Sequence, residues 1–553
     1  MKKILFAVIA LAAVCMLPMA AKKGNKTQVA QNLHIFNAIY KELQASYVDS
    51  LDANKEIRNA IDAMLMQIDP YTEYYPVEEQ SELMQISSGE FSGIGSLISQ
   101  RDGRIVLSEP QWNSPARAAG AKHGDVIISI DGDTLPYGYS TTEATKRLRG
   151  QAGTKVRLKV KRPYVTDSIV DIEITRGTIR TNPVPYYGML KDGVGYIKLT
   201  TFSEKSAQLV KEALLQLKKD PNFKSLVLDL RGNGGGLLES AVQIVGLFVP
   251  KGTQVVSTRY RDASNEKIYK TTQTPVDATV PMAVLVDNGT ASSSEIVSGA
   301  LQDLDRAVII GQRTYGKGLV QTSRPLPYEG LLKLTVARYY IPSGRLIQAI
   351  DYSHRNPDGT VARIPDSLTN VFHTKIGREV RDGGGITPDI KVENKEINRM
   401  LYNIVADYWA YDYANRFAAR TGDKMPSADD FAVTDSIFDD FKAFIDPDKF
   451  QYDRMCESGL KLLREAAEKE GYMTDSVSEQ FNKLEALLKH DLEHDLDHNK
   501  TEIVEFLDDE ISSRYYSEGD CVKRTLSNDP DVEAAIGVLT DPEKYKALLS
   551  PAK

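Results

Sequence analysis

The sequence predicts a multidomain α+β protein: a helical N-terminal domain, a β-rich domain, an α/β core with a mostly parallel sheet, and a helical C-terminal region. Two observations support this prediction. The chain has 553 residues, of which 42% are hydrophobic and 26% charged, an ordinary globular composition on a length that several domains share. The spacing of apolar residues also alternates between helical and strand-like periods along the chain. We place the four parts at residues 22–85, 86–178, 179–391 and 392–553.

The charge balance limits the class of partner. The formal net charge is −8, from 76 acidic and 68 basic residues. A protein that binds nucleic acid generally carries an excess of basic residues, because it must neutralise phosphates. The sequence therefore argues against a nucleic-acid partner.

Residues 1–21 have the three regions of a secretory signal peptide: two lysines after Met1, an apolar run from Ile4 to Leu17, and small residues ending at Ala21. The alternative is an uncleaved anchor, which needs about 20 apolar residues. We expect export to the periplasm or cell envelope, and no stable membrane span once the signal is removed. Processing leaves Cys456 and Cys521, and the sequence leaves open whether they pair.

The N-terminal domain is predicted from apolar and aromatic residues at helical spacing. They include Leu33, Phe36, Tyr40, Leu43 and Tyr47. The turn-rich stretch 69–76 then ends the helical pattern.

Short alternating strands and one helix near 140–148 characterise residues 86–178. The loop Phe91-Ser-Gly-Ile-Gly-Ser-Leu97 and the segment from Pro115 to Asp125 resemble a PDZ domain. This resemblance implies a peptide-binding loop whose backbone N–H groups receive a terminal carboxylate, made by Gly93, Ile94, Gly95, Ser96 and Leu97. A plain β-barrel-like module with a glycine bulge is the alternative.

Strands and helices alternate from about 193 to 391, which predicts an α/β layer with functional loops at the carboxyl ends of its strands. The first such loop is Arg231-Gly-Asn-Gly-Gly-Gly236, whose backbone can bind either a phosphate or an oxyanion. A second glycine segment, from Gly311 to Lys317, fits seven positions of a P-loop. Gly318 stands where a P-loop has Ser or Thr, so the sequence disfavours nucleotide binding.

Three serines, Ser292 to Ser294, follow another strand at a helix start. Serine at such a position is usually an N-cap. As a nucleophile it needs a base, and no histidine falls between His123 and His354. Lysine is a base when burial favours its neutral form, and Lys317 lies between two glycines before an apolar strand.

The runs Gly289–Asp303 and Gly311–Gln321 closely resemble the carboxy-terminal processing peptidases, also called tail-specific proteases. The resemblance implies an endopeptidase in which Ser292 forms an acyl-enzyme, Lys317 is the general base, and Gln321 orients the lysine amine. It also implies an oxyanion hole made by the backbone of Ser293 and, as the best choice in its glycine run, Gly235. No metal or cofactor is implied, and the substrates are proteins or peptides with apolar C-termini. On sequence alone, Ser293 and Ser294 remain rival nucleophiles.

Two other classes compete with this interpretation: a catalytically inactive PDZ scaffold, and a binding protein for apolar ligands built on the same core. The C-terminal region has His490, His494 and His498 at a spacing that predicts one helix face. Three such residues extend about 12 Å along a helix and cannot share one metal ion. We therefore expect a solvated acidic helix there, and a homodimer through paired helices.

Overall fold

The computed structural model describes residues 27–80, 89–166, 168–262, 264–356, 360–393, 398–422, 424–452 and 454–551. The predicted signal peptide at 1–21 lies outside these residues. The chain divides into two compact units, one of the residues up to Val77 with Gln321–Thr335 and one of Glu78–Val320 with Val336–Lys553. Among the described residues, no helix is both long and apolar enough to cross a membrane.

The first unit contains a helix over residues 27–46, helix α2 (Ala53–Met66) and strand β1 (Glu73–Tyr75). Strand β1 pairs antiparallel with β18 (Leu331–Tyr340), placing Glu73 opposite Lys333. The carboxylate of Asp69 accepts hydrogen bonds from the N–H groups of Tyr71 and Thr72, each at 2.8 Å, and so ends the helical segment. The predicted helices form, but Phe36 is 50% exposed and Leu65 is the only buried residue of α2. Among the described residues of this unit, the helices therefore leave most of their apolar side chains exposed.

The PDZ region is built on a sheet with strand order β3-β4-β5-β7-β8. Val156, Leu158 and Val160 of β7 are at most 1% exposed, because every second side chain of this strand points into the core. The sheet leaves β3 at its edge. The elements are β2 (Glu90–Gly93), β3 (Ser96–Arg101), β4 (Arg104–Pro110), α4 (Pro115–Ala118), β5 (Asp125–Ile130), β6 (Asp133–Thr134), α5 (Thr141–Leu148), β7 (Lys155–Lys161), β8 (Ile169–Thr175) and β9 (Gly177–Arg180).

A six-stranded sheet forms the α/β core, in the order β10-β11-β12-β15-β16-β23. All its neighbouring strands are parallel except β10 with β11. Strands β12 and β15 are buried along their whole length, which explains their continuous apolar sequences. The strands are β10 (Tyr187–Met189), β11 (Val194–Lys198), β12 (Ser225–Asp229), β15 (Met282–Val286), β16 (Val308–Gly311) and β23 (Ile390–Lys391).

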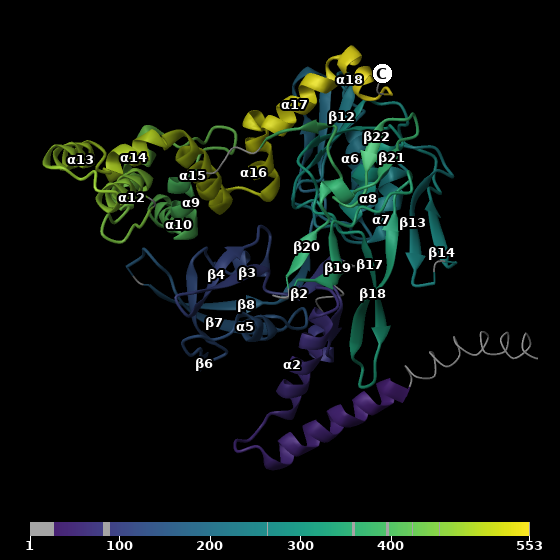
Figure 1. The fold of residues 1–553 in the computed structure, drawn as a ribbon, viewed down its shortest axis with the longest axis horizontal. Coiled ribbons are helices and arrows are strands. Elements are labelled where there is room, and N and C mark those ends of the chain that lie inside the picture. The colour runs from purple at the N-terminus through teal and green to yellow at the C-terminus, as the bar shows by residue number, and fades with distance from the viewer. Residues whose placement is uncertain are drawn as a thin grey trace, which may run out of the picture. The chain divides into compact units, whose positions relative to one another are not determined.

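Helices α6 (Ser206–Leu217), α7 (Leu238–Val245) and α8 (Ser293–Asp303) pack on one face of this sheet. The other face is covered by α17 (Pro530–Leu539) and α18 (Pro542–Leu548), from near the C-terminus (Figure 1). Val532 and Ile536 of α17 share a buried cluster with Val227 and Leu285 of the central strands. The last two helices are thus packed as part of the α/β core.

A second sheet has the order β1-β18-β13-β14, with β17 also paired to β18. Its remaining strands are β13 (Gln254–Tyr260), β14 (Glu266–Lys270) and β17 (Leu319–Pro325). Two small hairpin pairs complete the strands: β19 (Ile350–Arg355) with β20 (Val361–Arg363), and β21 (Val371–His373) with β22 (Glu379–Arg381).

The C-terminal region forms a helical domain around Tyr413, Phe438 and Phe441, all buried. The predicted face of three histidines is wrong, because His490 precedes α14 and its Nδ1 lies 2.7 Å from Asp495 Oδ2. The helices are α9 (Arg399–Ala406), α10 (Trp409–Thr421), α11 (Asp435–Phe444), α12 (Met455–Lys469), α13 (Asp475–Leu487), α14 (Leu492–His498), α15 (Lys500–Tyr515) and α16 (Glu518–Thr525).

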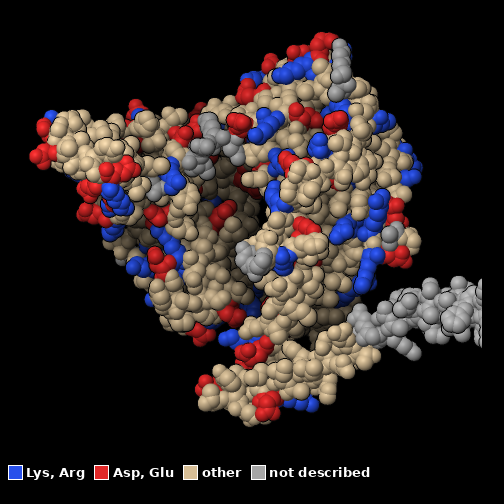
Figure 2. Space-filling model, viewed as in Figure 1, with Lys and Arg blue, Asp and Glu red and all other residues tan. Residues whose placement is uncertain are grey.

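Two further features concern the surface charges and the cysteines. Figure 2 shows acidic and basic side chains interspersed on the displayed face. Cys456 is exposed and Cys521 is half-buried, and both are free thiols.

Candidate active site

Ser292 lies at the sharp turn between β15 and α8. Its backbone has φ 57° and ψ −115°, which is unusual for a residue with a side chain and costs of order 1–3 kcal/mol. Ser292 is half-buried, whereas Ser293 and Ser294 are 1% and 0% exposed. The turn therefore leaves the first of the three serines accessible.

The hydroxyl groups of Ser293 and Ser294 both donate hydrogen bonds within the fold. Ser293 Oγ donates to the Gly236 carbonyl and Ser294 Oγ to the Asn233 carbonyl, both at 2.8 Å. These bonds attach the serine turn to the glycine loop that follows β12. The hydroxyl groups of Ser293 and Ser294 are therefore buried and used in holding the two loops together, whereas Ser292 is half-buried.

A buried carboxylate, that of Glu295, connects the serine turn to the segment that carries Lys317. Its Oε2 accepts hydrogen bonds from the backbone N–H groups of Ser292 and Lys317, both at 2.9 Å. Its Oε1 accepts bonds from Thr314 Oγ1 at 2.5 Å and from the Gly316 N–H at 2.8 Å. One side chain therefore holds both segments in contact.

The pKa of Glu295 is raised to about 7, because burial disfavours the carboxylate more than its four donors favour it. The folded protein thus holds this proton more tightly than an unfolded chain, whose glutamate has the ordinary pKa of 4.5. The resulting stabilisation is complete below pH 4.5 and is lost as the pH rises through about 7. Between these limits we expect the free energy of unfolding to fall by about 3 kcal/mol more in wild type than in Glu295→Gln. Urea denaturation across pH checks this, and parallel curves would contradict it.

The backbone around Lys317 packs closely against two other segments, one at Tyr339 and one at Gln348 and Ala349. The Gly318 carbonyl accepts a bond from the Tyr339 N–H at 3.0 Å, and the Gly316 carbonyl accepts one from the Ala349 N–H at 2.9 Å. A Cβ on Gly316 would lie 2.3 Å from the Ala349 Cβ, and one on Gly318 would lie 2.8 Å from the Gln348 nitrogen. This close approach explains why glycine flanks the lysine on both sides. Lys317 itself is half-buried.

Tyr339 gives a second link between the two segments. Its hydroxyl donates to the Lys317 carbonyl and lies 3.2 Å from the Ser292 carbonyl oxygen. The side chain is 1% exposed. Nothing in the sequence distinguishes Tyr339 from other residues, since an aromatic side chain in a strand has the pattern of any core position.

Gly235 lies directly beside Ser292. Its N–H group donates to Asn233 Oδ1 at 2.9 Å. Its role as an oxyanion donor stays a prediction. A Cβ on Gly235 would lie 2.7 Å from the Ser292 Cβ, so glycine is required here to leave room for the serine.

The remaining predicted residues lie on other elements. Gln321 is on β17, and its amide nitrogen donates to Thr335 Oγ1 at 3.1 Å. In the PDZ loop, the carbonyls of Ile94 and Gly95 accept bonds from the N–H groups of Ala116 and Gln111, at 2.8 and 3.0 Å. Leu97, at the start of edge strand β3, is 54% exposed. An unpaired strand edge of this kind can add a peptide as a further strand.

Three family models match the chain. Peptidase family S41 matches residues 193–358, a PDZ domain matches residues 106–162, and the "Probable PDZ-protease, C-terminal helical domain" matches residues 400–539. These matches agree with a mixed helical and stranded protein that contains a PDZ domain and a C-terminal helical domain.

Several named proteins are similar to this chain over more than 300 residues. A carboxy-terminal-processing protease of Bartonella bacilliformis is 37% identical over 330 residues, which cover 59% of this chain and 75% of that protein. The carboxy-terminal processing protease CtpA of Bacillus subtilis is 36% identical over 312 residues, 56% of this chain and 66% of that protein. The solved photosystem II D1 C-terminal processing protease is 27% identical with a TM-score of 0.37, and the match covers 65% of this chain and 86% of that one. The resemblance noted in the sequence is thereby confirmed: the chain belongs to the carboxy-terminal-processing proteases, which are serine-type peptidases of family S41.

Proposed function

We propose that the protein is an endopeptidase in which Ser292 attacks the peptide carbonyl and Lys317 is the general base. The observation that carries the proposal is the Glu295 side chain, whose Oε2 binds the backbone N–H groups of both residues at 2.9 Å. Holding a nucleophile and its base in one fixed arrangement is the condition for activating a serine. Neutral Lys317 takes the Ser292 proton as Oγ attacks, and gives that proton to the amine that leaves when the C–N bond breaks and the acyl-enzyme forms. Lys317, neutral again, takes a proton from the water that attacks the acyl-enzyme and returns it to Ser292 Oγ as the acid product leaves.

The proposed site also stabilises the negative charge that develops on the carbonyl oxygen. Ser293 is the first residue of α8, and its N–H group is at the helix N-terminus, where anions are stabilised. Gln321 is assigned to orient the lysine amine. Export to the cell envelope belongs to the same proposal and rests only on the pattern of residues 1–21.

The test compares wild type with Ser292→Ala, Ser293→Ala and Ser294→Ala on an unfolded protein that carries an apolar C-terminus. We expect cleavage by wild type and none by Ser292→Ala. The two controls remove hydroxyls from the same turn, and we expect them to retain measurable cleavage at reduced stability. Absence of cleavage by wild type, or equal cleavage by wild type and Ser292→Ala, would contradict the mechanism and favour the inactive scaffold or the ligand-binding protein.

We further propose that the PDZ domain recruits the substrate's C-terminus, with Gly93, Ile94, Gly95, Ser96 and Leu97 forming the carboxylate loop. Edge strand β3 and the neighbouring helix α5 supply the groove for the peptide. This part of the proposal rests on the exposed edge, on Leu97 and on the glycine-containing loop.

Amidation of the substrate's C-terminus is expected to raise KM by roughly tenfold or more, because hydrogen bonds to a charged group contribute about 1.5–3 kcal/mol. The value of kcat is expected to change little, since the carboxylate is remote from the cleaved bond. Steady-state kinetics on a matched pair of peptides, free acid and amide, measure both constants. Equal KM values for the pair would remove the PDZ loop from substrate recognition.

A further inference from the structure

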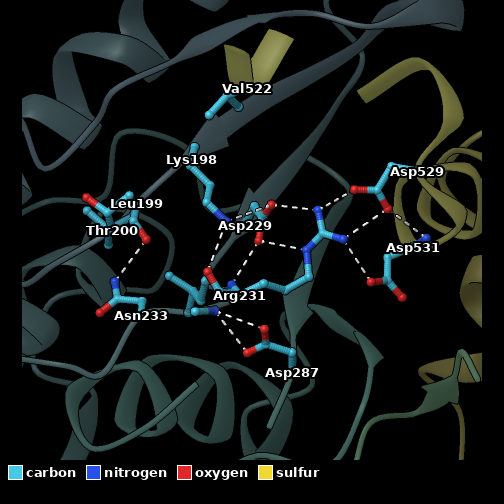
Figure 3. A network of polar contacts seen from close by, with 12 residues as sticks. Lys198, Leu199, Thr200, Asp229, Arg231, Asn233, Asp287, Val522, Asp529 and Asp531 are labelled. Atoms are coloured by element: carbon cyan, nitrogen blue, oxygen red, sulfur yellow. Dashed lines mark hydrogen bonds and ion pairs between the residues drawn. The ribbon is translucent and has the colours of Figure 1, made fainter. Parts of the chain in front are cut away.

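Arg231, the first residue of the glycine loop, lies among three carboxylates (Figure 3). Its guanidinium donates to Asp229 and forms a two-pronged pair with Asp529, at 2.9 and 2.6 Å. A further bond of 2.8 Å reaches Asp531 Oδ2. Two of the three acids therefore come from the start of α17, about 300 residues further along the chain.

This cluster is shielded from water. Relative exposures are 18% for the Arg231 side chain, 13% for Asp529 and 11% for Asp531. Separating Arg231 from one of its carboxylate partners would leave a shielded charge without a partner, which is costly. The four side chains are therefore held in this arrangement. The loop and the helix are thus held at one relative position.

The same network fixes the main chain of Arg231. Its N–H group donates to Asp229 Oδ1 at 2.8 Å, and its carbonyl accepts a bond from Lys198 Nζ at 2.9 Å. The next residue, Gly232, donates to Asp287 Oδ1 at 2.9 Å. Both polar backbone groups at the start of the loop are therefore fixed.

From there the loop passes directly beside the proposed nucleophile. The Asn233 carbonyl receives the Ser294 hydroxyl at 2.8 Å, and the Gly236 carbonyl receives the Ser293 hydroxyl at 2.8 Å. Gly235 approaches Ser292 so closely that it has no room for a Cβ. A displacement of Arg231 would move the part of the loop that borders Ser292.

We propose that Asp529 and Asp531 are positioning residues of the peptidase site, which set the glycine loop beside Ser292 by holding Arg231 from α17. The inference rests on the proposed function, and it extends the site to a helix beyond the residues that match family S41. Neither aspartate contacts the reacting atoms. Their effect is on kcat through the loop.

The experiment compares Asp529→Asn, Asp531→Asn and the double variant with wild type, measuring kcat and KM on a tailed peptide. Asparagine keeps the size of each side chain and, at 529, keeps the oxygen that caps α17 by accepting the Asp531 and Val532 N–H groups. We expect kcat to fall about tenfold in each single variant and about 100-fold in the double, because a loop displaced by about 1 Å can cost 10² in rate. KM is expected to stay within twofold.

The matched control is Glu533→Gln. Glu533 lies on the same helix and forms a 2.7 Å ion pair with Lys191, but this exposed pair does not contact the glycine loop. The Glu533→Gln substitution removes one negative charge from α17, as each aspartate variant does, and we expect kcat to be unchanged. Arg231→Lys, which keeps the charge but loses the two-pronged geometry, is expected to lower kcat as the aspartate variants do.

All kinetics are run well below each variant's melting temperature, with folded content checked by near-UV circular dichroism. Variants of Asp529 and Asp531 with wild-type kcat, or with a loss no larger than that of Glu533→Gln, would overturn the inference. A loss of kcat that matches the loss of folded protein would overturn it as well. Cleavage by wild type but not by Ser292→Ala tests the proposed function separately, so the two failures are distinguishable.

Discussion

Lys317→Arg is expected to be as inactive as Ser292→Ala, with kcat lowered by roughly 10⁴-fold or more. The guanidinium keeps the positive charge and much of the length of the lysine side chain. It does not lose a proton in proteins, so it cannot accept the proton of Ser292. The substitution therefore separates a base from a mere positive charge at this position.

The kinetics are measured on a tailed peptide between pH 7 and 10. KM is expected to change by no more than a few-fold, because the peptide-binding loop is left intact. Lys211→Arg, on an exposed part of α6, is the matched control and is expected to behave as wild type. If Lys317→Arg retained a tenth of the wild-type kcat, Lys317 would be acting through its charge and the general-base role would be wrong.

Val532→Asp is expected to unfold the peptidase core. Val532 is 1% exposed and packs against the sheet face that holds Val227 and Leu285. Placing a carboxylate there without a partner costs several kcal/mol, which is a large share of the 5–15 kcal/mol that stabilises a typical domain. Urea denaturation followed by far-UV circular dichroism measures the loss.

Gly537→Asp is the control, since it adds the same charge to the same helix at an exposed position with nothing within 4 Å of the new Cβ. Its stability is expected to stay within about 1 kcal/mol of wild type. Comparable unfolding midpoints for the two variants would show that α17 is dispensable for the core.

Much of the peptidase core could be predicted because its signals are local. Strands β12 and β15 have continuous apolar sequences, and the loops after them carry the glycines and serines that singled out the site. The cover supplied by α17 could not be predicted, because Val532 and Ile536 have the spacing of any amphipathic helix. Nothing in that spacing says which surface the helix packs against.

In the candidate site too, local features could be predicted and long-range contacts could not. Glu295 at N3 of α8 has the local signature of a capping box, but three of its four donors come from residues 314 to 317. A glycine run indicates that N–H groups are available without showing where each one points, and the bond from the Gly235 amide to Asn233 could not be predicted. The histidine face failed for a related reason: helical spacing continued through a break before α14, where His490 takes Asp495 as its partner.

The packing of α17 and α18 also affects the order in which the peptidase core can assemble. A chain that emerges from its N-terminus onward has one face of the core sheet uncovered until residues 530–548 are available. Contacts of such long sequence separation form late in folding. The sheet face that holds Val227 and Leu285 is therefore closed late in folding, when α17 and α18 dock on it.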